Sequence, residues 1–346
     1  MKQTFPITPL QTKIIPALQQ AIDQKTKPLG ALGKLEQLAL RIGQIQQTLT
    51  PALQRPTVVV FAGDHGIAAE GVSAYPQAVT QQMVLNFLSG GAAINVFTRQ
   101  HGLNLYIVDA GVNADLPNDP YLLKRKIARG TRNFRQEPAM TAAQCEEAVA
   151  QGAEVVAMMG QAGCNIIAFG EMGIANTSAA AVIMSLLGPV PLETCVGRGA
   201  GLDDPGLARK IQVLQAAIRQ HAIAPEPFPV LTTYGGFEIA MLCGAFLQAA
   251  AERMIILVDG FIVTAALLVA ARLYPAVPDY CIFSHLSDEA GHQKLLALLN
   301  ADPLLHLNLR LGEGTGAVLA YPLVESAVRL LNEMASFASA GVSTKL

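Results

Sequence analysis

The sequence predicts an α/β protein with a doubly wound, mainly parallel sheet and a small helical domain built from both chain ends. Short, continuously apolar runs end abruptly in Gly, Asp or another polar residue, and segments of helical length and composition separate them. Apolar strands without polar alternation are typical of a parallel sheet covered on both faces. Their alternation with helices favours a doubly wound arrangement. Residues 1–50 show no strand signal, and residues 316–338 form another long helical run.

The elements that we expect follow this alternation along the chain. The predicted strands are Thr57–Ala62, Leu105–Val108, Asn165–Phe169, Met254–Val258 and Tyr280–Phe283, with Pro229–Thr233 as a further candidate. The predicted helical segments are 9–22, 31–48, 76–99, 141–161, 205–221, 237–251, 261–272 and 316–338. We therefore expect a large catalytic domain over 51–312 and a small helical domain from 1–50 plus 313–346, with fraying of the tail 339–346.

Composition narrows the classes of partner. Hydrophobic residues make up 51% of the chain and charged residues 14%, which is typical of a folded protein with a large core. The net charge is -2, so no basic field is present to attract nucleic acid or an anionic membrane surface. The composition therefore favours small-molecule substrates, with neither nucleic acid nor membrane as a partner.

Apolar stretches and cysteines indicate a cytoplasmic protein. The longest uncharged run, 172–192, carries polar residues and a Gly-Pro break, so we interpret it as a buried segment and not as a membrane span. The first residues lack the apolar region of a secretory signal. Five widely spaced cysteines, without a CxxC pair, are expected to be free thiols in a reducing compartment and to form neither a disulfide framework nor a metal site.

The densest chemical signal is the loop Arg310–Gly316, in which Glu313 stands between two glycines. Glycines allow the backbone to approach a ligand closely, and a following helix offers free N–H groups to an anion. Glu313 is therefore a candidate catalytic carboxylate. The alternative is that it only caps backbone donors at the start of the helix.

A second signal is Gly170–Ser178, which follows a predicted strand and opens a helix. It contains neither GxGxxG nor a P-loop. Gly173, Asn176 and Thr177 are candidates for holding a phosphate or ribose, and Glu171 for accepting bonds from ribose hydroxyls. The alternative is an ordinary strand-to-helix turn with a capping residue.

The glycine-rich stretch 196–204 is followed shortly by Lys210. A flexible backbone with a nearby cation suits a phosphate, so Gly197, Gly199 and Lys210 are candidate phosphate ligands. A mobile surface loop with a solvated lysine is the alternative.

Several strand ends carry His or Asp without a recognised metal spacing. We interpret Asp64 and His65 as structural hydrogen-bonding residues. Asp109, Asp259 and Glu238 are interpreted as caps or supporting residues. Whether Asp64, His65, Asp259 and His285 contact a ligand directly is left open by the sequence, and no metal site is predicted.

Taken together, these segments resemble one family, the nicotinate-nucleotide:dimethylbenzimidazole phosphoribosyltransferases, which act in the synthesis of the lower ligand of cobalamin. The resemblance covers nearly the whole chain in order, and the ordered set of motifs carries it. The matching stretches are Lys27–Glu36, Ala62–Gly66, Glu70–Pro76, Gly90–Asn95, Ala128–Gly130, Gly170–Asn176, Gly235–Phe237, Leu257–Phe261, Ser284–His285 and Arg310–Gly316.

The resemblance implies a homodimer that uses no cofactor. It implies transfer of 5-phosphoribose from nicotinate mononucleotide to 5,6-dimethylbenzimidazole, giving α-ribazole 5′-phosphate and nicotinate. The family's general base falls on Glu313, and its other site residues fall on Glu171, Lys210, Ser287 and Leu311.

The segment after Gly71 is implied to line the pocket for the acceptor base, with Tyr75, Gln82 and Met83 as candidates. Some members carry serine where this chain has Tyr75, which leaves the acceptor open. Another acceptor on the same scaffold, or a non-catalytic nucleotide-binding protein, are the alternatives. A nicotinamide-dependent oxidoreductase is disfavoured by the missing GxGxxG.

Overall fold

The computed structural model describes residues 3–343, so the end of the tail that we expected to fray lies outside the described residues. Its strands are β1 Thr57–Gly63, β2 Asn104–Gly111, β3 Leu122–Lys124, β4 Ile166–Met172, β5 Ile255–Val258, β6 Cys281–Phe283, β7 His285–Leu286 and β8 Leu305–His306. Its helices before β5 are α1 Ile15–Asp23, α2 Lys34–Gln46, η1 Gly66–Glu70, α3 Ala78–Leu88, α4 Ala93–His101, α5 Ala142–Gln161, α6 Asn176–Leu187, α7 Leu192–Cys195, α8 Asp204–His221, α9 Pro227–Tyr234 and α10 Phe237–Ala251. The later helices are α11 Phe261–Leu273, η2 Val277–Tyr280, α12 His292–Leu298, α13 Thr315–Glu333 and α14 Phe337–Ala340.

Six strands form one parallel sheet in the order β3-β2-β1-β4-β5-β6, and β7 and β8 form a small parallel pair. The chain moves outward in one direction from β1 and in the other from β4, so the order reverses between these two strands. In doubly wound sheets, ligands bind beyond the carboxyl ends of the strands at such a reversal. The topology therefore directs attention to the loops after β1 and β4.

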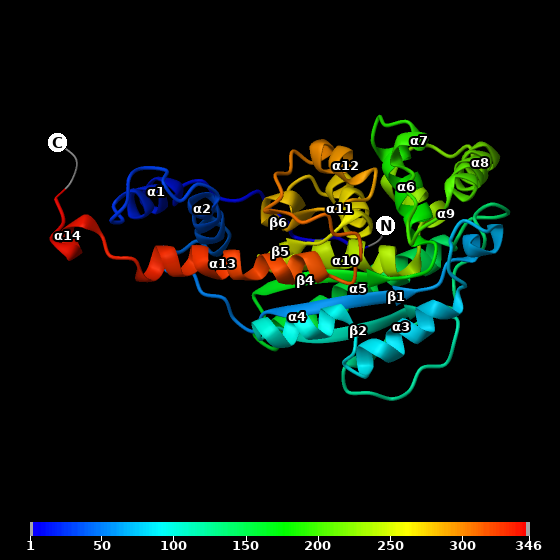
Figure 1. The fold of residues 1–346 in the computed structure, drawn as a ribbon, viewed down its shortest axis with the longest axis horizontal. Helices are drawn as coiled ribbons and strands as arrows, with labels where there is room; N and C mark the ends of the chain where they lie inside the picture. Colours follow the sequence, from blue (N-terminus) through cyan, green and yellow to red (C-terminus); the bar gives the residue numbers. More distant parts are fainter. Residues whose placement is uncertain (1–2, 344–346) are drawn as a thin grey trace.

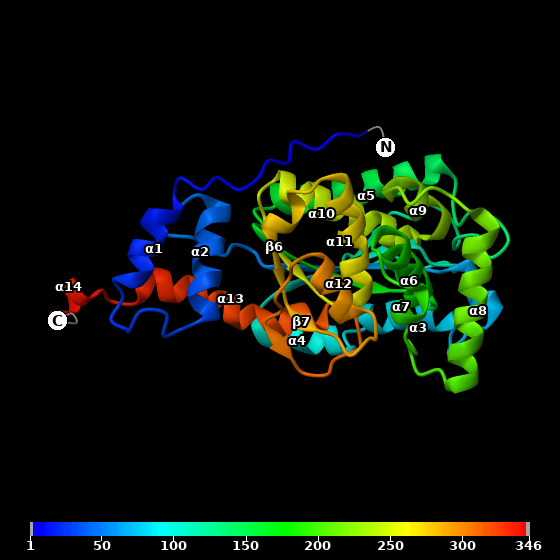
Figure 2. The same ribbon diagram turned by 90° about the horizontal axis from the view of Figure 1, so that it is seen from above.

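Helices cover both faces of the sheet, which confirms the predicted doubly wound α/β fold. Helix α10 lies against one face with α5 packed on it, and α3, α4 and α13 lie against the other (Figure 1, Figure 2). Helices α5 and α10 approach closely at glycines: a Cβ added at Gly152 would lie 1.9 Å from the Met241 carbonyl oxygen. No helix among residues 3–343 combines the length and apolarity needed to cross a membrane.

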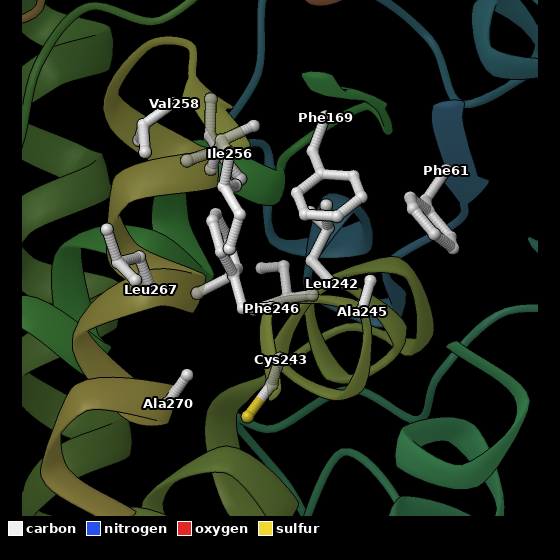
Figure 3. Packing of buried hydrophobic residues seen from close by; sticks show 14 of the residues in the cluster. Phe61, Phe169, Leu242, Cys243, Ala245, Phe246, Ile256, Val258, Leu267 and Ala270 are labelled. Carbon is white, nitrogen blue, oxygen red and sulfur yellow. The ribbon is translucent and has the colours of Figure 1, made fainter. Parts of the chain in front are cut away.

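The core between the sheet and α10 is built from aromatic and aliphatic side chains (Figure 3). Phe169 of β4 packs edge-on against Phe61 of β1 and Phe246 of α10, with ring centroids 6.2 and 4.9 Å apart. These rings are fully buried. They pack α10 against the middle of the sheet. Because this apolar contact lies away from the carboxyl ends of the strands, polar residues can occupy those ends.

One predicted strand is wrong: Pro229–Thr233 lies within the helix α9. Its β-branched residues favoured a strand, but Pro227 occupies the first helical turn, where proline's missing N–H costs nothing. The Thr232 hydroxyl donates 2.8 Å to the Phe228 carbonyl oxygen one turn back, which satisfies it inside a helix. The predicted helical segment 76–99 is also divided, into α3 and α4, by a turn at Gly90 with φ of 79°.

Helices α1 and α2 and the second half of α13 lie together at one end of the molecule, whereas the residues before α1 run back over the α/β part, where Phe5 N–H donates to the Tyr274 hydroxyl (Figure 1, Figure 2). In the cluster of α1, α2 and α13 the backbones also join, because Thr26 N–H donates to the Ala335 carbonyl and Phe337 N–H donates to that of Gln24. Helix α13 starts at the sheet, next to β4 and β5, and ends in this helical cluster. The division into two domains stays a prediction.

Candidate active site

The carboxyl ends of the strands open onto a cavity of about 390 Å³. Its walls come from the loops after β4, β5 and β7, from α3 and from the glycine loop before α13. The lining residues include Tyr75, Met83, Glu171, Gly173, Asn176, Thr177, Gly199, His285, Ser287, Glu289, Arg310, Leu311 and Glu313. A larger cavity of about 580 Å³ lies away from these strand ends. There Lys34 is already paired with Asp302 and Arg41 donates to the Asp279 carbonyl, so the strand-end cavity is the candidate site.

Glu313 sits in a loop of three consecutive left-handed residues. The φ angles are 79° at Gly312, 63° at Glu313 and 85° at Gly314. Two of the three positions are therefore glycine, which adopts this conformation freely. Glu313 adopts it at a cost of order 1–3 kcal/mol, and such strain concentrates at functional sites. The conformation turns a carboxylate that is 4% exposed toward the cavity.

This loop rests directly on β4. A Cβ added at Gly170 would lie 2.4 Å from the Glu313 carbonyl carbon and oxygen, so only glycine permits this contact. A Cβ at Gly312 would lie 2.2 Å from Oε1 of Glu171. The missing side chains at these glycines bring the Glu171 and Glu313 segments together at the end of one strand.

Asp259, which follows β5, accepts hydrogen bonds from the backbone at the end of this loop and at the start of α13. Its Oδ2 accepts from Gly314 N–H and its Oδ1 from Ala317 N–H, both at 3.1 Å. A carboxylate at a helix N-terminus satisfies free donors and is favoured by the helix dipole. Asp259 therefore caps α13, as the sequence suggested, and fixes the backbone that directly follows Glu313.

Burial raises the pKa of Glu313 to about 7, against a hydrogen bond from the Ile94 backbone N–H that lowers it, and the charge of Asp259 raises it further. Burial likewise raises the pKa of Glu171 to about 8, with Asn176 opposing and Asp259, Glu238 and Glu313 adding. Asn176 Nδ2 donates to Glu171 Oε2. Burial thus gives both carboxyls a higher proton affinity than an ordinary glutamate, as a carboxylate that takes up a proton near neutral pH requires.

Of the predicted phosphate residues, Gly199 lines the cavity, Gly197 lines an adjoining cavity, and Lys210 lies buried behind them without lining either. Lys210 is fully buried, and its Nζ donates 2.8 Å to Thr177 Oγ1 and 3.2 Å to the Gly197 carbonyl oxygen. Burial lowers the pKa of Lys210 to about 8, against the raising effect of Glu289. A solvated surface lysine, the alternative interpretation, is therefore wrong for the described structure.

A chain of hydrogen bonds supports Ser287. Its backbone N–H donates 2.8 Å to Nδ1 of His292, whose Nε2 lies 3.1 Å from the Thr264 hydroxyl. Because Thr264 donates its own proton to the Gly260 carbonyl, His292 must donate from Nε2 and is neutral. Burial, with the charge of His285, lowers the pKa of His292 to about 3, in agreement with this assignment.

His285 lines the cavity beside Ser287, with its Nε2 3.5 Å from Oδ1 of Asp259. Burial lowers its pKa, but the hydrogen bond and charge of Asp259 outweigh burial and leave the pKa raised. Of the four residues left open by the sequence, His285 thus reaches the cavity, whereas Asp259 supports the loop.

His65 and Glu238 form a completely buried pair at the end of β1, with 2.5 Å between Nε2 and Oε1. Added Cβ atoms at Gly63, Gly173 and Gly236 would all come within 3.4 Å of the pair. Asp64 accepts 2.8 Å from Asn113 N–H. The hydrogen bonding that the sequence predicted for Asp64 and His65 is present, and neither residue lines the cavity.

The mouth of the cavity carries the predicted base-pocket residues Tyr75, Met83 and Leu311. Tyr75 is 52% exposed and Leu311 57%, so they present apolar surface at an open edge. Gln82 is exposed on α3 and does not line the cavity. Helical geometry explains this, because Val79 and Met83 share a face of α3 at the i, i+4 spacing and Gln82 lies off it.

Thr177, which the sequence predicted beside Gly173 and Asn176, lines the cavity, but two further polar lining residues, Glu289 and Arg310, were not predicted to bind a ligand. Arg310 stands inside a glycine-rich motif and could have been proposed from it. Glu289 lies in an irregular segment after β7 and carries no local signal. Among residues 3–343, no group of three or more His, Cys, Asp or Glu side chains is placed to hold a metal ion.

Comparison with known proteins identifies the family. A family model described as "Phosphoribosyltransferase" matches residues 7–342. The chain is 63% identical to the nicotinate-nucleotide–dimethylbenzimidazole phosphoribosyltransferase of Cupriavidus taiwanensis, over 98% of this chain and 99% of the relative. It is 64% identical to the enzyme of the same name from Cupriavidus necator, with the same coverage.

A solved structure agrees in fold. The crystal structure of CobT from Thermus thermophilus is 45% identical and has a TM-score of 0.93, covering 96% of this chain and 100% of the other. The predicted family and enzyme class are therefore confirmed. The chain is a phosphoribosyltransferase and belongs to the nicotinate-nucleotide–dimethylbenzimidazole phosphoribosyltransferase family.

Proposed function

We propose that this enzyme transfers the 5-phosphoribosyl group of nicotinate mononucleotide to 5,6-dimethylbenzimidazole, with inversion at C1′ and Glu313 as the general base. The products are α-ribazole 5′-phosphate and nicotinate. The observation that carries the proposal is the buried Glu313 carboxylate, whose pKa is raised to about 7, facing a cavity with an apolar mouth. The names of the close relatives supply the substrates.

The chemistry needs a base and no acid. Nicotinate mononucleotide already holds a cationic pyridinium ring at C1′, so the ring leaves with the electron pair of the broken bond and needs no proton. One nitrogen of the acceptor bonds to C1′ while its other nitrogen must lose a proton. A carboxylate with a pKa near the working pH accepts that proton effectively. Attack on the face opposite the leaving group converts a β to an α linkage.

The surrounding residues divide the remaining work. Glu171, whose pKa is raised by burial and whose carboxyl is held by Asn176, suits hydrogen bonding to the ribose hydroxyls. Gly197, Gly199 and Lys210 supply backbone and ammonium donors for the 5′-phosphate, with Gly173 and Ser287 completing the wall. Tyr75, Met83 and Leu311 offer an apolar edge for a flat acceptor ring.

The acceptor is tested by product analysis. The enzyme is incubated with nicotinate mononucleotide and, separately, 5,6-dimethylbenzimidazole, unsubstituted benzimidazole, adenine or a phenol, and products are identified by mass spectrometry. We expect the highest kcat/KM with 5,6-dimethylbenzimidazole. A higher value with adenine or a phenol would reassign the acceptor, and no transfer to any of them would favour a nucleotide-binding protein.

The pH dependence should follow Glu313. Because the base must be ionised, we expect kcat/KM to rise about tenfold per pH unit below pH 7 and to level off above it. The effect on stability has the opposite sign: an unfolded glutamate ionises near 4.5, so between pH 4.5 and 7 the native state binds more protons and this residue's contribution to stability falls as pH rises. Initial rates and urea unfolding across this range measure both; a flat rate profile would argue against Glu313.

We also propose that the enzyme works as a cytoplasmic homodimer with a large domain over 51–312 and a small one from 1–50 plus 313–346. The backbone hydrogen bonds between residues 24–26 and 335–337 support the domain division. Sedimentation of the purified enzyme tests the dimer, which would be excluded by a monomeric mass at working concentration.

A further inference from the structure

The glycine loop predicted to hold the phosphate already holds an anion from the chain itself. The Glu289 carboxylate lies near the Gly199 backbone N–H, which lowers the pKa of the carboxyl. Its Oε2 lies against Gly197, where an added Cβ would be only 2.3 Å away. Both glycines are thus used to bring backbone close to a negative charge, which is the contact that a phosphate oxygen would make.

Two cations face this carboxylate, and one anion lies beside it. Burial raises the pKa of Glu289, and the charge of the neighbouring Asp288 raises it further. The charges of Lys210 on α8 and of Arg310, before the loop that holds Glu313, lower it, but the net pKa is raised. Arg310 Nη1 donates 3.3 Å to the Gly199 carbonyl, so it also braces the loop. The positive charges are therefore gathered around a place that Glu289 fills.

Glu289 lies between two neighbouring cavities. It lines the cavity of the candidate active site and an adjoining cavity of about 410 Å³, together with Gly199 and Arg310. The backbone of Glu289 is held at both sides, because its N–H donates to Ser287 Oγ at 3.3 Å and its carbonyl accepts from His292 N–H. Its side chain, which extends from this fixed backbone, can turn away without unfolding the segment.

We infer that Glu289 is a resident anion in the phosphate site, which the 5′-phosphate of the substrate must displace, and that it thereby selects phosphorylated ligands. This rests on the proposed function. A carboxylate offers one charge and two oxygens, whereas a phosphate monoester offers up to two charges and three free oxygens, so the phosphate competes successfully. An unphosphorylated riboside has no anionic group at its 5′ position with which to displace it.

The test compares Glu289→Gln with wild type in calorimetric titrations with ribose 5-phosphate and with nicotinate riboside. Glutamine keeps the shape and removes the competing charge. We expect ribose 5-phosphate to bind about tenfold more tightly to the variant, since a like charge beside the phosphate is gone. The riboside should bind unchanged. Glu193→Gln, which removes an exposed carboxylate four residues before Gly197, is the matched control and should change neither affinity.

Unchanged or weaker binding of ribose 5-phosphate to Glu289→Gln would overturn the inference, as would equal tightening of both ligands. Weaker binding would mean that Glu289 itself receives hydrogen bonds from the ligand. If Glu289→Gln does not fold, Glu289→Ala tests the same direction of effect. If the wild-type enzyme binds ribose 5-phosphate but does not transfer phosphoribose from nicotinate mononucleotide to any acceptor, the proposed function is wrong. The inference about Glu289 would then still stand.

Discussion

Replacing Glu313 by glutamine is expected to lower kcat by about 10²- to 10⁴-fold, the range that a positioned general base contributes. Glutamine has nearly the same shape, so Gly170, Asp259 and the left-handed loop stay compatible with it. The KM for nicotinate mononucleotide should change little, because the base acts on the acceptor. Steady-state rates with both substrates varied separate the two effects.

Two further measurements make the Glu313 result specific. The residual activity of Glu313→Gln should lose its dependence on a group titrating near pH 7. Glu325→Gln, a change at a partly exposed position further along α13, should leave the rate near wild type. A variant of Glu313 that retains full turnover would show that the proton goes elsewhere.

Replacing Gly170 by alanine is expected to lower kcat/KM by about 100-fold, although the residue does not line the cavity. The added Cβ would lie 2.4 Å from backbone atoms of Glu313 and 2.6 Å from Gly314 N, so the loop must move away from β4. Misplacing a catalytic group by about 1 Å can cost that factor. Overpacking of this kind should also cost about 1–3 kcal/mol of unfolding free energy, measurable by urea denaturation.

Gly260→Ala is the matched control for stability. It adds the same methyl group after the next strand, where the neighbouring atoms lie at ordinary distances of 3.5–3.8 Å. Its unfolding free energy should stay close to that of wild type. Wild-type activity and stability in Gly170→Ala would contradict the tight contact between β4 and the loop that holds Glu313.

The parallel sheet could be predicted because its signal is local: each buried strand is a run of apolar residues that stops at a polar one. The strand predicted at Pro229–Thr233 is wrong because the same local signal can occur in a helix. β-branched residues favour a strand locally, but the packing of α9 against α6 and α11, together with Pro227 at its start, decides for a helix. The break between α3 and α4 depends on Gly90 in a left-handed turn, which a composition-based prediction passes over.

The site was predictable where glycines mark it and not where it depends on tertiary contact. Glu313, Glu171 and Lys210 stand in or after glycine-rich motifs, and the structure brings their segments together. Gln82 was misplaced because a family segment was carried over without regard to which face of α3 it occupies. Glu289 could not be found, because its role arises only when the segment after β7 folds against the loop before α8.

The length of helix α13 couples the helical cluster to the loop that holds Glu313. The first turn of this helix is fixed by Asp259 beside Glu313, the proposed base, and its far end packs against α2. Nineteen helical residues span about 28 Å, so the helix acts as a lever arm on the loop that holds Glu313. A tilt of about 2° at one end corresponds to roughly 1 Å of travel at the other. The rigidity of the helical cluster therefore sets how accurately a carboxylate far from it is aimed.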